Sequence, residues 1–192
     1  MSLYLHSLRF CDAAKALTDL WFSLPRKRGF VCPTKADFNP MKMRQHLKSV
    51  ALYEIQKNGS IITRVAGTKI EAFLGKEITG KNLLDVLPPE FVRTYQNHFY
   101  NLAKFPCAGL LDRPQIGIEG SFHLIKSLQL PLLNNLGKIT HFVGIAEPYP
   151  LPKHFTDYRA AAMAASRNIN INYVDIGAGV PEHVETNMAR GF

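Results

Sequence analysis

The spacing of apolar residues predicts an amphipathic helix near the start of the chain. Between residues 8 and 24, apolar side chains recur at steps of three and four, so they share one face of a helix. The members of this face are Leu8, Cys11, Ala14, Leu17, Leu20, Trp21 and Leu24. Pro25 ends the helix. Burying each large side chain is worth about 1.5–3 kcal/mol, so we expect this face to pack on a sheet or across a dimer interface.

A different pattern, typical of strands, follows from residue 50. Residues 50–56 and 61–66 predict two strands joined at Asn58-Gly59, a pair that tolerates the positive φ angles of a tight hairpin. Three later segments, residues 106–112, 121–130 and 138–146, also predict strands. Together these segments predict a five-stranded antiparallel sheet with the strand order 2-1-5-4-3.

The predicted helices of this domain lie between its second and third strands. Residues 68–74 predict a short helix capped by Thr68, and Gly75 and Gly80 then allow turns before a second short helix near residues 82–87. Residues 90–105 predict a longer helix with an apolar stripe. The stripe contains Phe91, Tyr95, His98, Phe99 and Leu102. The result is an α+β fold in which helices cover a sheet.

Proline positions and composition divide the chain into three parts. Residues 1–38 form an N-terminal helical extension, and residues 39–148 form the α+β domain. Pro148, Pro150 and Pro152 close that domain, because proline interrupts regular pairing and helices. Residues 149–192 are a C-terminal tail, in which the alanine-rich segment 157–167 predicts a short helix.

Several short motifs carry a resemblance to known proteins. They are Trp21 with Leu24-Pro25, Pro33-Thr34-Lys35-Ala36-Asp37-Phe38-Asn39-Pro40, Arg64-Val65-Ala66-Gly67-Thr68, Gly75-Lys76-Glu77-Ile78-Thr79-Gly80, and Leu130-Pro131-Leu132 with Gly137. In these motifs the chain resembles a PAS-like family of proteobacterial proteins, long catalogued as a domain of unknown function, although Lys35 stands where arginine is expected. The resemblance implies a PAS-like five-stranded antiparallel sheet with helices inserted between strands 2 and 3. It implies no established ligand.

Composition and charge narrow the function classes. Hydrophobic residues make up 46% of the chain, enough for a substantial core, and no apolar run is long enough to span a bilayer. The first residues lack the core of a signal peptide, so we expect a cytoplasmic protein. The net charge is +8, but only Arg26-Lys27-Arg28 forms a basic run, so we do not expect nucleic acid as a partner. The three cysteines show no metal-binding or redox spacing, and we expect no cofactor and no metal.

We expect no catalytic residues and name three candidate ligand-binding residues, Arg64, His123 and Tyr53. Arg64 lies on a strand that is otherwise apolar, and it either anchors an anionic ligand or pairs with an acidic residue on the outer face. His123 either contacts a ligand or metal together with His141 from another strand, or is structural. His98 is expected in the core. The strand register decides which of these side chains point inward.

We interpret the chain as a non-enzymatic PAS-like sensory or protein-interaction module. It would hold a small ligand in its core and act through a partner signalling protein or as a homodimer. One alternative is a small cone-shaped α+β enzyme of the isomerase type, for which a buried carboxylate or histidine with a perturbed pKa would argue. Glu54 and Glu119 are the nearest acidic candidates, and we expect both to face solvent. The other alternative is a basic nucleic-acid-binding protein, which a continuous basic groove would favour.

Overall fold

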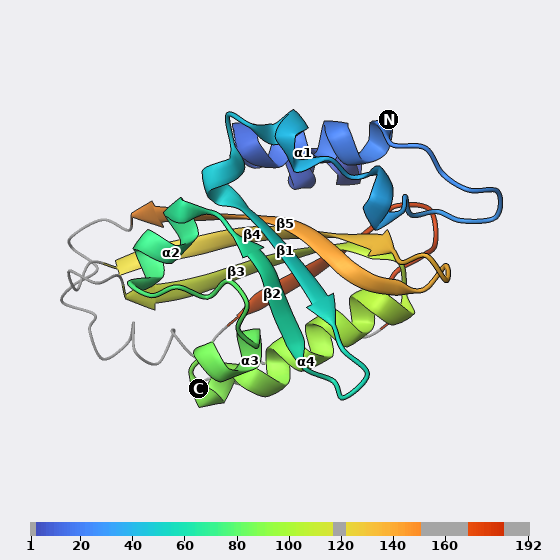
Figure 1. Ribbon diagram of the computed structural model, residues 1–192. Helices are drawn as coiled ribbons and strands as arrows, with labels where there is room; N and C mark the ends of the chain where they lie inside the picture. Colours follow the sequence, from blue (N-terminus) through green and yellow to red (C-terminus); the bar gives the residue numbers. More distant parts are fainter. Residues whose placement is uncertain (1–2, 117–121, 151–168, 183–192) are drawn as a thin grey trace.

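A single antiparallel sheet with helices on both faces organises the protein (Figure 1). The computed structural model describes residues 3–116, 122–150 and 169–182. The described strands are β1 (Val50–Ile55), β2 (Ile61–Ala66), β3 (Cys107–Ile116), β4 (Phe122–Leu133), β5 (Ile139–Pro150) and β6 (Asn170–Asp175). Their order across the sheet is β2-β1-β5-β4-β3-β6, so the predicted arrangement of the first five strands is confirmed.

The sixth strand corrects the prediction of five. β6 comes from the segment that we interpreted as a tail, and it pairs antiparallel with the outer edge of β3, where Val174 lies opposite Ala108. Asn170, Asn172 and Asp175 disfavour strands by propensity, which hid this strand in the sequence. Pairing with β3 and burial of Ile171 and Val174 supply the missing stability. The predicted helix at residues 157–167 lies outside the described residues.

β3, β4 and β5 each extend beyond their predicted ends through a proline. Pro114 lies opposite Leu124, Pro131 lies opposite Phe142, and Pro148 lies opposite Ile125 within paired strands. Proline cannot donate to a strand ladder, so the sequence pattern favoured shorter strands. The extension of β3 to Ile116 matters most, because it brings further side chains onto the inner faces of the sheet.

One face of the sheet is covered by the N-terminal segment. A 3₁₀ helix (Leu3–Arg9) precedes α1 (Asp12–Ser23), so the predicted helix is interrupted. Cys11 is extended and caps α1, because its Sγ accepts a hydrogen bond from the Ala14 N–H. The predicted apolar face is buried against the sheet, where Leu17 and Trp21 pack in one cluster with Leu130. Three further 3₁₀ helices (Lys35–Asp37, Pro40–Met43 and Leu47–Ser49) lead from α1 to β1.

The opposite face is covered by the helices between β2 and β3, namely α2 (Thr68–Leu74), α3 (Leu83–Val86) and α4 (Pro89–Lys104). Figure 1 shows α3 and α4 on the side of the sheet away from α1. α2 has its predicted bounds, but Gly67 rather than Thr68 is its cap. Phe99 of α4 contacts Tyr53 and Phe142 edge-on, with ring centroids 5.3 and 5.2 Å away. No helix in the described ranges is long and apolar enough to cross a membrane.

Candidate functional site

A cavity of about 610 Å³ lies between α2–α4 and the inner face of the sheet. Small-molecule sites in proteins typically have volumes of about 300–1,000 Å³. Aromatic side chains supply much of the wall. They are Tyr53, Phe73, Phe91, Tyr95 and Phe99. The cavity is therefore of a size and character that suit a small, largely apolar molecule.

Short helical elements make the wall and the mouth of this cavity. α2 has seven residues and α3 has four, so each presents few side chains to the sheet. Glu71 holds their connection in place, because its Oε1 accepts hydrogen bonds from the Ile78 and Thr79 N–H groups at 2.9 and 3.0 Å. These bonds lower the pKa of Glu71. Exposed Asp85 and Glu90 also line the cavity and so belong to its open side.

Arg113 of β3 is a buried cation in the cavity wall, with 7% of its surface exposed. Its Nη2 donates a hydrogen bond to the Gln115 Oε1, and its guanidinium carbon lies 5.3 Å from the centroid of the Phe91 ring. Its Nε has no hydrogen-bond partner among the described residues. A buried guanidinium held by an amide and an aromatic ring has donor capacity left for an anion.

A polar chain connects the cavity wall to β6. The His98 Nε2 lies 3.0 Å from the Gln129 Oε1, and the His98 Nδ1 lies 3.3 Å from the Tyr173 hydroxyl. Asn101 donates to the same hydroxyl. If His98 donates through Nε2, each group in the chain has a consistent role and the Gln129 amide keeps its own donors. Gln129 also lines the cavity, so the chain begins at the cavity wall.

Burial keeps His98 neutral. The side chain is 1% exposed, and burial lowers the pKa of His98 to about 4. Burial also raises the pKa of Tyr173 to about 12. Gly109 makes room for the imidazole, because a Cβ at that position would lie 2.5 Å from the His98 Cε1. The buried histidine with a shifted pKa is thus explained by packing in the core, as expected for His98.

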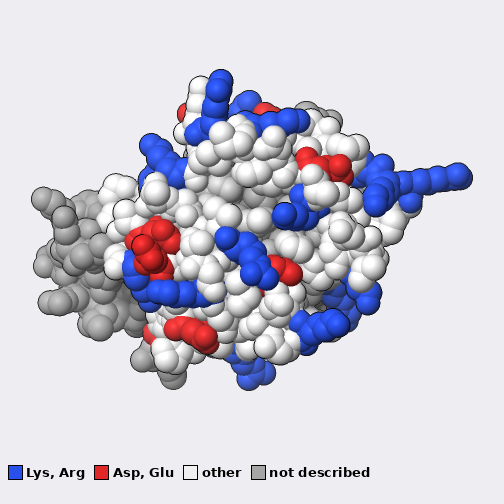
Figure 2. All heavy atoms as spheres, viewed as in Figure 1, with Lys and Arg blue, Asp and Glu red and all other residues white. Residues whose placement is uncertain are grey.

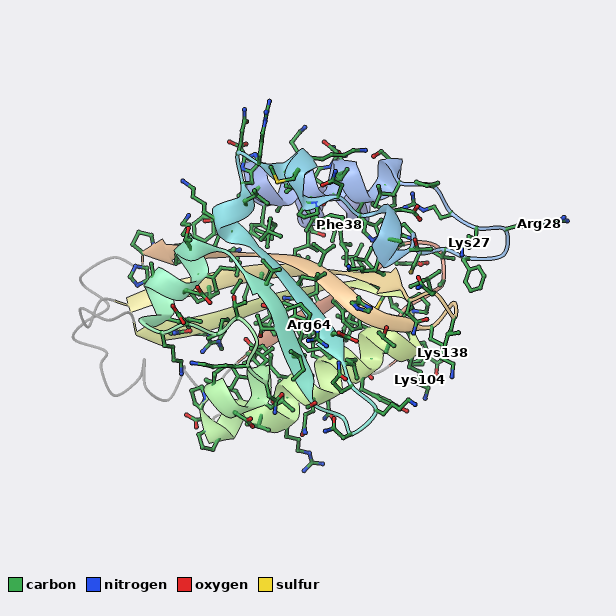
Figure 3. All side chains as sticks on the ribbon, in the orientation of Figure 1. Lys27, Arg28, Phe38, Arg64, Lys104 and Lys138 are labelled. Carbon is green, nitrogen blue, oxygen red and sulfur yellow. The ribbon has the colours of Figure 1, made fainter. Side chains whose placement is uncertain are left out.

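The structure separates the three candidate residues. Tyr53 lines the cavity, and burial raises the pKa of its hydroxyl well above the usual range. Arg64 is exposed on the edge strand, and its Nε lies 2.5 Å from the Glu54 Oε2 (Figure 3). His123 contacts Phe73 edge-on at 5.0 Å but is not one of the described lining residues. Their roles in binding a ligand stay predictions.

The two strand histidines lie far apart. His123 is opposite Pro150 in the β4–β5 ladder, whereas His141 is opposite Leu132 near its other end. The His141 Nε2 lies 3.7 Å from the Glu54 Oε2, and burial lowers the pKa of His141. Within the described residues, no group of three or more His, Cys, Asp or Glu residues could hold a metal ion. Burial raises the pKa values of Cys32 and Cys107 to about 12, which leaves these thiols unreactive.

Sequence reasoning missed Arg113. The predicted third strand ended at Asp112, so Arg113 fell in a loop. The extended strand continues the alternation of faces, and Gly109, Leu111, Arg113 and Gln115 share the inner face. The signal that could have found Arg113 is the two-residue period of the strand. A strand that continues past Pro114 places Arg113 on the same face as the apolar Leu111, and therefore inside.

Charged residues on the molecular surface are dispersed. On the face drawn in Figure 2, Lys and Arg side chains are separated by uncharged surface and by acidic groups. Lys27 and Arg28 lie on a loop, with Lys104 and Lys138 toward the same end in the view of Figure 3. Arg26, the remaining member of the basic run, donates hydrogen bonds to the backbone carbonyl oxygens of Trp21 at the end of α1 and of Val31 in the loop that follows. The face drawn shows no continuous basic groove.

The chain belongs to the PAS domain family. A family model described as PAS domain matches residues 10–146, which is more than half of the chain. The resemblance seen in the sequence motifs is therefore confirmed at the level of the PAS family. A comparison with curated proteins found no match.

Several solved structures are similar to this chain at low sequence identity. The Vibrio cholerae VqmA dimer is 10% identical over 58% of this chain and 52% of that chain, with a TM-score of 0.46. The PAS domain of a Colwellia psychrerythraea protein is 14% identical over 58% and 98% of the two chains, with a TM-score of 0.42. A sensory box sensor histidine kinase from Vibrio cholerae is 15% identical over 56% and 84%, with a TM-score of 0.37. The chain thus spans about half the length of this VqmA chain.

Proposed function

We propose that this PAS domain binds a small molecule in the cavity and transmits its bound state to a partner protein, without catalysing a reaction. The observation that carries the proposal is the aromatic cavity of about 610 Å³ beneath α2–α4. Binding sites of this kind combine a mostly apolar wall with a few polar groups that orient the ligand. Here Tyr53, Arg113 and Gln129 are among the polar groups of the wall.

The polar groups at the cavity suit binding better than catalysis. The Ser127 hydroxyl donates its hydrogen bond to the Leu111 carbonyl oxygen, so no base activates it as a nucleophile. Both ring nitrogens of His98 are engaged by Gln129 and Tyr173. Asp85 and Glu90, the carboxylates among the described lining residues, are exposed to solvent. A general acid of the isomerase type needs a buried carboxyl group instead.

The polar chain through His98 offers a physical route for the output. A ligand that hydrogen-bonds Gln129 would change the partner of the His98 Nε2, and Tyr173 carries that change to β6 at the edge of the sheet. An edge strand presents unpaired backbone groups to which a partner or a second copy can bind. Binding of a ligand in the cavity would then change the affinity of the β6 edge for its partner.

Native mass spectrometry of the purified protein tests the binding proposal. We expect a mass excess that disappears on denaturation, and we expect Ala146→Leu, which fills part of the cavity from β5, to reduce it. Ala72→Leu makes the same change at an exposed position of α2 and should keep the excess. A cavity that stays empty, with no stabilisation of the protein by a library of small metabolites, would contradict the proposal. Conversion of any bound compound would contradict its non-catalytic part.

A further inference from the structure

We propose that the ligand of the cavity is a carboxylic acid with one negative charge and an apolar body, and that Arg113 is its anchor. This inference rests on the proposed function, because it names the chemistry of the molecule that the cavity takes. The anchor proposed here is Arg113 in the cavity wall, in place of Arg64 at the edge of the sheet.

Arg113 is charged, buried and without an acidic partner in the described part of the chain. The ion pairs within residues 3–116, 122–150 and 169–182 do not include it. Gln115 accepts from one end of the guanidinium, and the Nε has no acceptor. Burying a charge without a counter-charge is strongly unfavourable. A bound anion would supply the counter-charge that these residues lack.

Arg26 is an arginine with a structural role, and its contacts can be compared with those of Arg113. Its guanidinium lies 4.6 Å from the centroid of the Trp21 ring, as that of Arg113 lies over Phe91. Its donors, however, go to backbone carbonyl oxygens. The acceptors are Trp21, Phe22, Leu24 and Val31. Arg113 shares the aromatic contact but lacks this set of acceptors, so its side chain is held in position with donors to spare.

The wall around Arg113 fits a single negative charge. Gln115 and Gln129 are neutral, and Arg113 is the buried cation among the described lining residues. A carboxylate carries one charge and matches the planar fork of arginine. A phosphate monoester would bring a second charge, and the described lining residues offer no second buried cation to receive it, because Lys76 lies exposed at the open side with Asp85 and Glu90. The aromatic remainder of the wall accommodates the apolar body of the acid.

Matched acids and amides test this inference on the full chain. The probes are octanoate with octanamide and 4-phenylbutanoate with 4-phenylbutanamide, each pair equal in size and differing in charge. Calorimetric titration should give at least about tenfold tighter binding of the acid within a pair. Arg113→Met should abolish that preference, and Arg113→Gln serves if the methionine variant does not fold. Arg64→Met, a charge removed at the exposed sheet edge, is the control and should keep the preference.

The outcomes separate this inference from the proposed function. Equal binding of acid and amide by the native protein overturns the inference and leaves the cavity a binding site for neutral molecules. A preference for the acid that survives Arg113→Met but is lost in Arg64→Met also overturns it. If no probe binds, molecules extracted from the denatured protein decide the matter. A retained acid whose retention depends on Arg113 supports the inference, a retained neutral molecule overturns it, and the absence of both overturns it together with the proposed function.

Discussion

The two faces of the sheet are packed in different ways. On the α1 face, a twelve-residue helix lays Leu17 and Trp21 directly on β4 and β5, and both side chains are fully buried. On the opposite face, α2 and α3 are short, and a cavity of about 610 Å³ remains beneath them. A long amphipathic helix offers a continuous apolar stripe, whereas short helices joined by glycine turns do not. The α1 face is therefore closed by side-chain packing, whereas the opposite face packs Phe99 of α4 on the sheet and keeps space for a ligand beneath α2 and α3.

The largest expected loss of stability comes from a substitution on the α1 face. Trp21→Ala should lower the free energy of unfolding by about 3–5 kcal/mol, because it removes a fully buried ring and the hydrogen bond from its Nε1 to the Pro131 carbonyl oxygen. Phe73→Ala, on the cavity face, should cost only about 1 kcal/mol since its half-buried ring already borders empty space. Urea denaturation measures both values. Equal losses would remove the contrast between the faces.

The pH dependence of stability should report on the cavity face through His98. Its pKa is lowered to about 4 in the folded protein from a usual 6.5, so the unfolded chain binds more protons between these values. Stability should therefore fall as the pH drops from about 6.5 to about 4, by about 3 kcal/mol in total. His141, whose pKa is also lowered by burial, acts in the same direction. His98→Gln should remove most of the slope in this window.

Carboxylates contribute little to the change in stability over most of the range between pH 4 and 6.5. The lowered pKa values of Glu54, Glu71 and Asp175 cause losses of stability that begin near the usual carboxyl pKa and grow below it, so they overlap only the acidic end of this window. A slope between pH 4 and 6.5 that is the same in the native protein and in His98→Gln would contradict the assignment of His98 as a buried neutral group.

Gly109 should show how tightly the polar chain is packed. Gly109→Ala places a Cβ against the His98 ring and should cost about 2 kcal/mol. In His98→Ala the clash is absent, so the cost of the double variant should be smaller than the sum of the single costs. A double-mutant cycle of unfolding free energies measures this coupling. Additive costs would show that the ring can move aside freely.

The smallest effect compares two arginines, one on each face. Arg26→Met should lower stability by about 1 kcal/mol or more, because four backbone carbonyl oxygens lose a donor. Arg113→Met should raise the stability of the ligand-free protein by about 1 kcal/mol, since it removes a buried charge without an acidic partner among the described residues. Thermal unfolding of ligand-free samples checks both signs. A loss in both variants would mean that Arg113 is a structural residue like Arg26.

Local sequence signals predicted much of the fold. The bounds of β2 and α2 agree with the predicted segments 61–66 and 68–74, and Gly59 has the positive φ of +84° that the hairpin requires. The α1 stripe is buried as its spacing indicates. These features depend on residues close together in the chain, where periodicity and turn chemistry act directly.

The candidate site was only partly predictable. Tyr53 reaches the cavity because the alternation of β1 puts it on the inner face. Arg64 pairs with Glu54 at the sheet edge and is the extra residue at a register shift, where Val65 lies opposite Leu52 and Thr63 opposite Tyr53. No local sequence pattern predicts this shift. β6 depends on pairing with β3, which lies far away in the sequence, and the inward position of Arg113 depends on the β3–β4 ladder continuing through Pro114.

By itself, the sequence determined the β1–β2 hairpin, the helices inserted after β2 and the apolar stripe of α1, because each follows from the spacing of neighbouring residues. Its motifs resemble those of PAS-like proteins, and that resemblance implied the class of fold and the order of the first five strands. The tertiary structure alone decided where the cavity lies, that β6 completes the sheet, that His98 is neutral, and that Arg113 rather than Arg64 is buried at the wall. The physical reason is that burial, register and the pairing of charges arise between segments far apart in the chain, and their energies exist only once those segments meet.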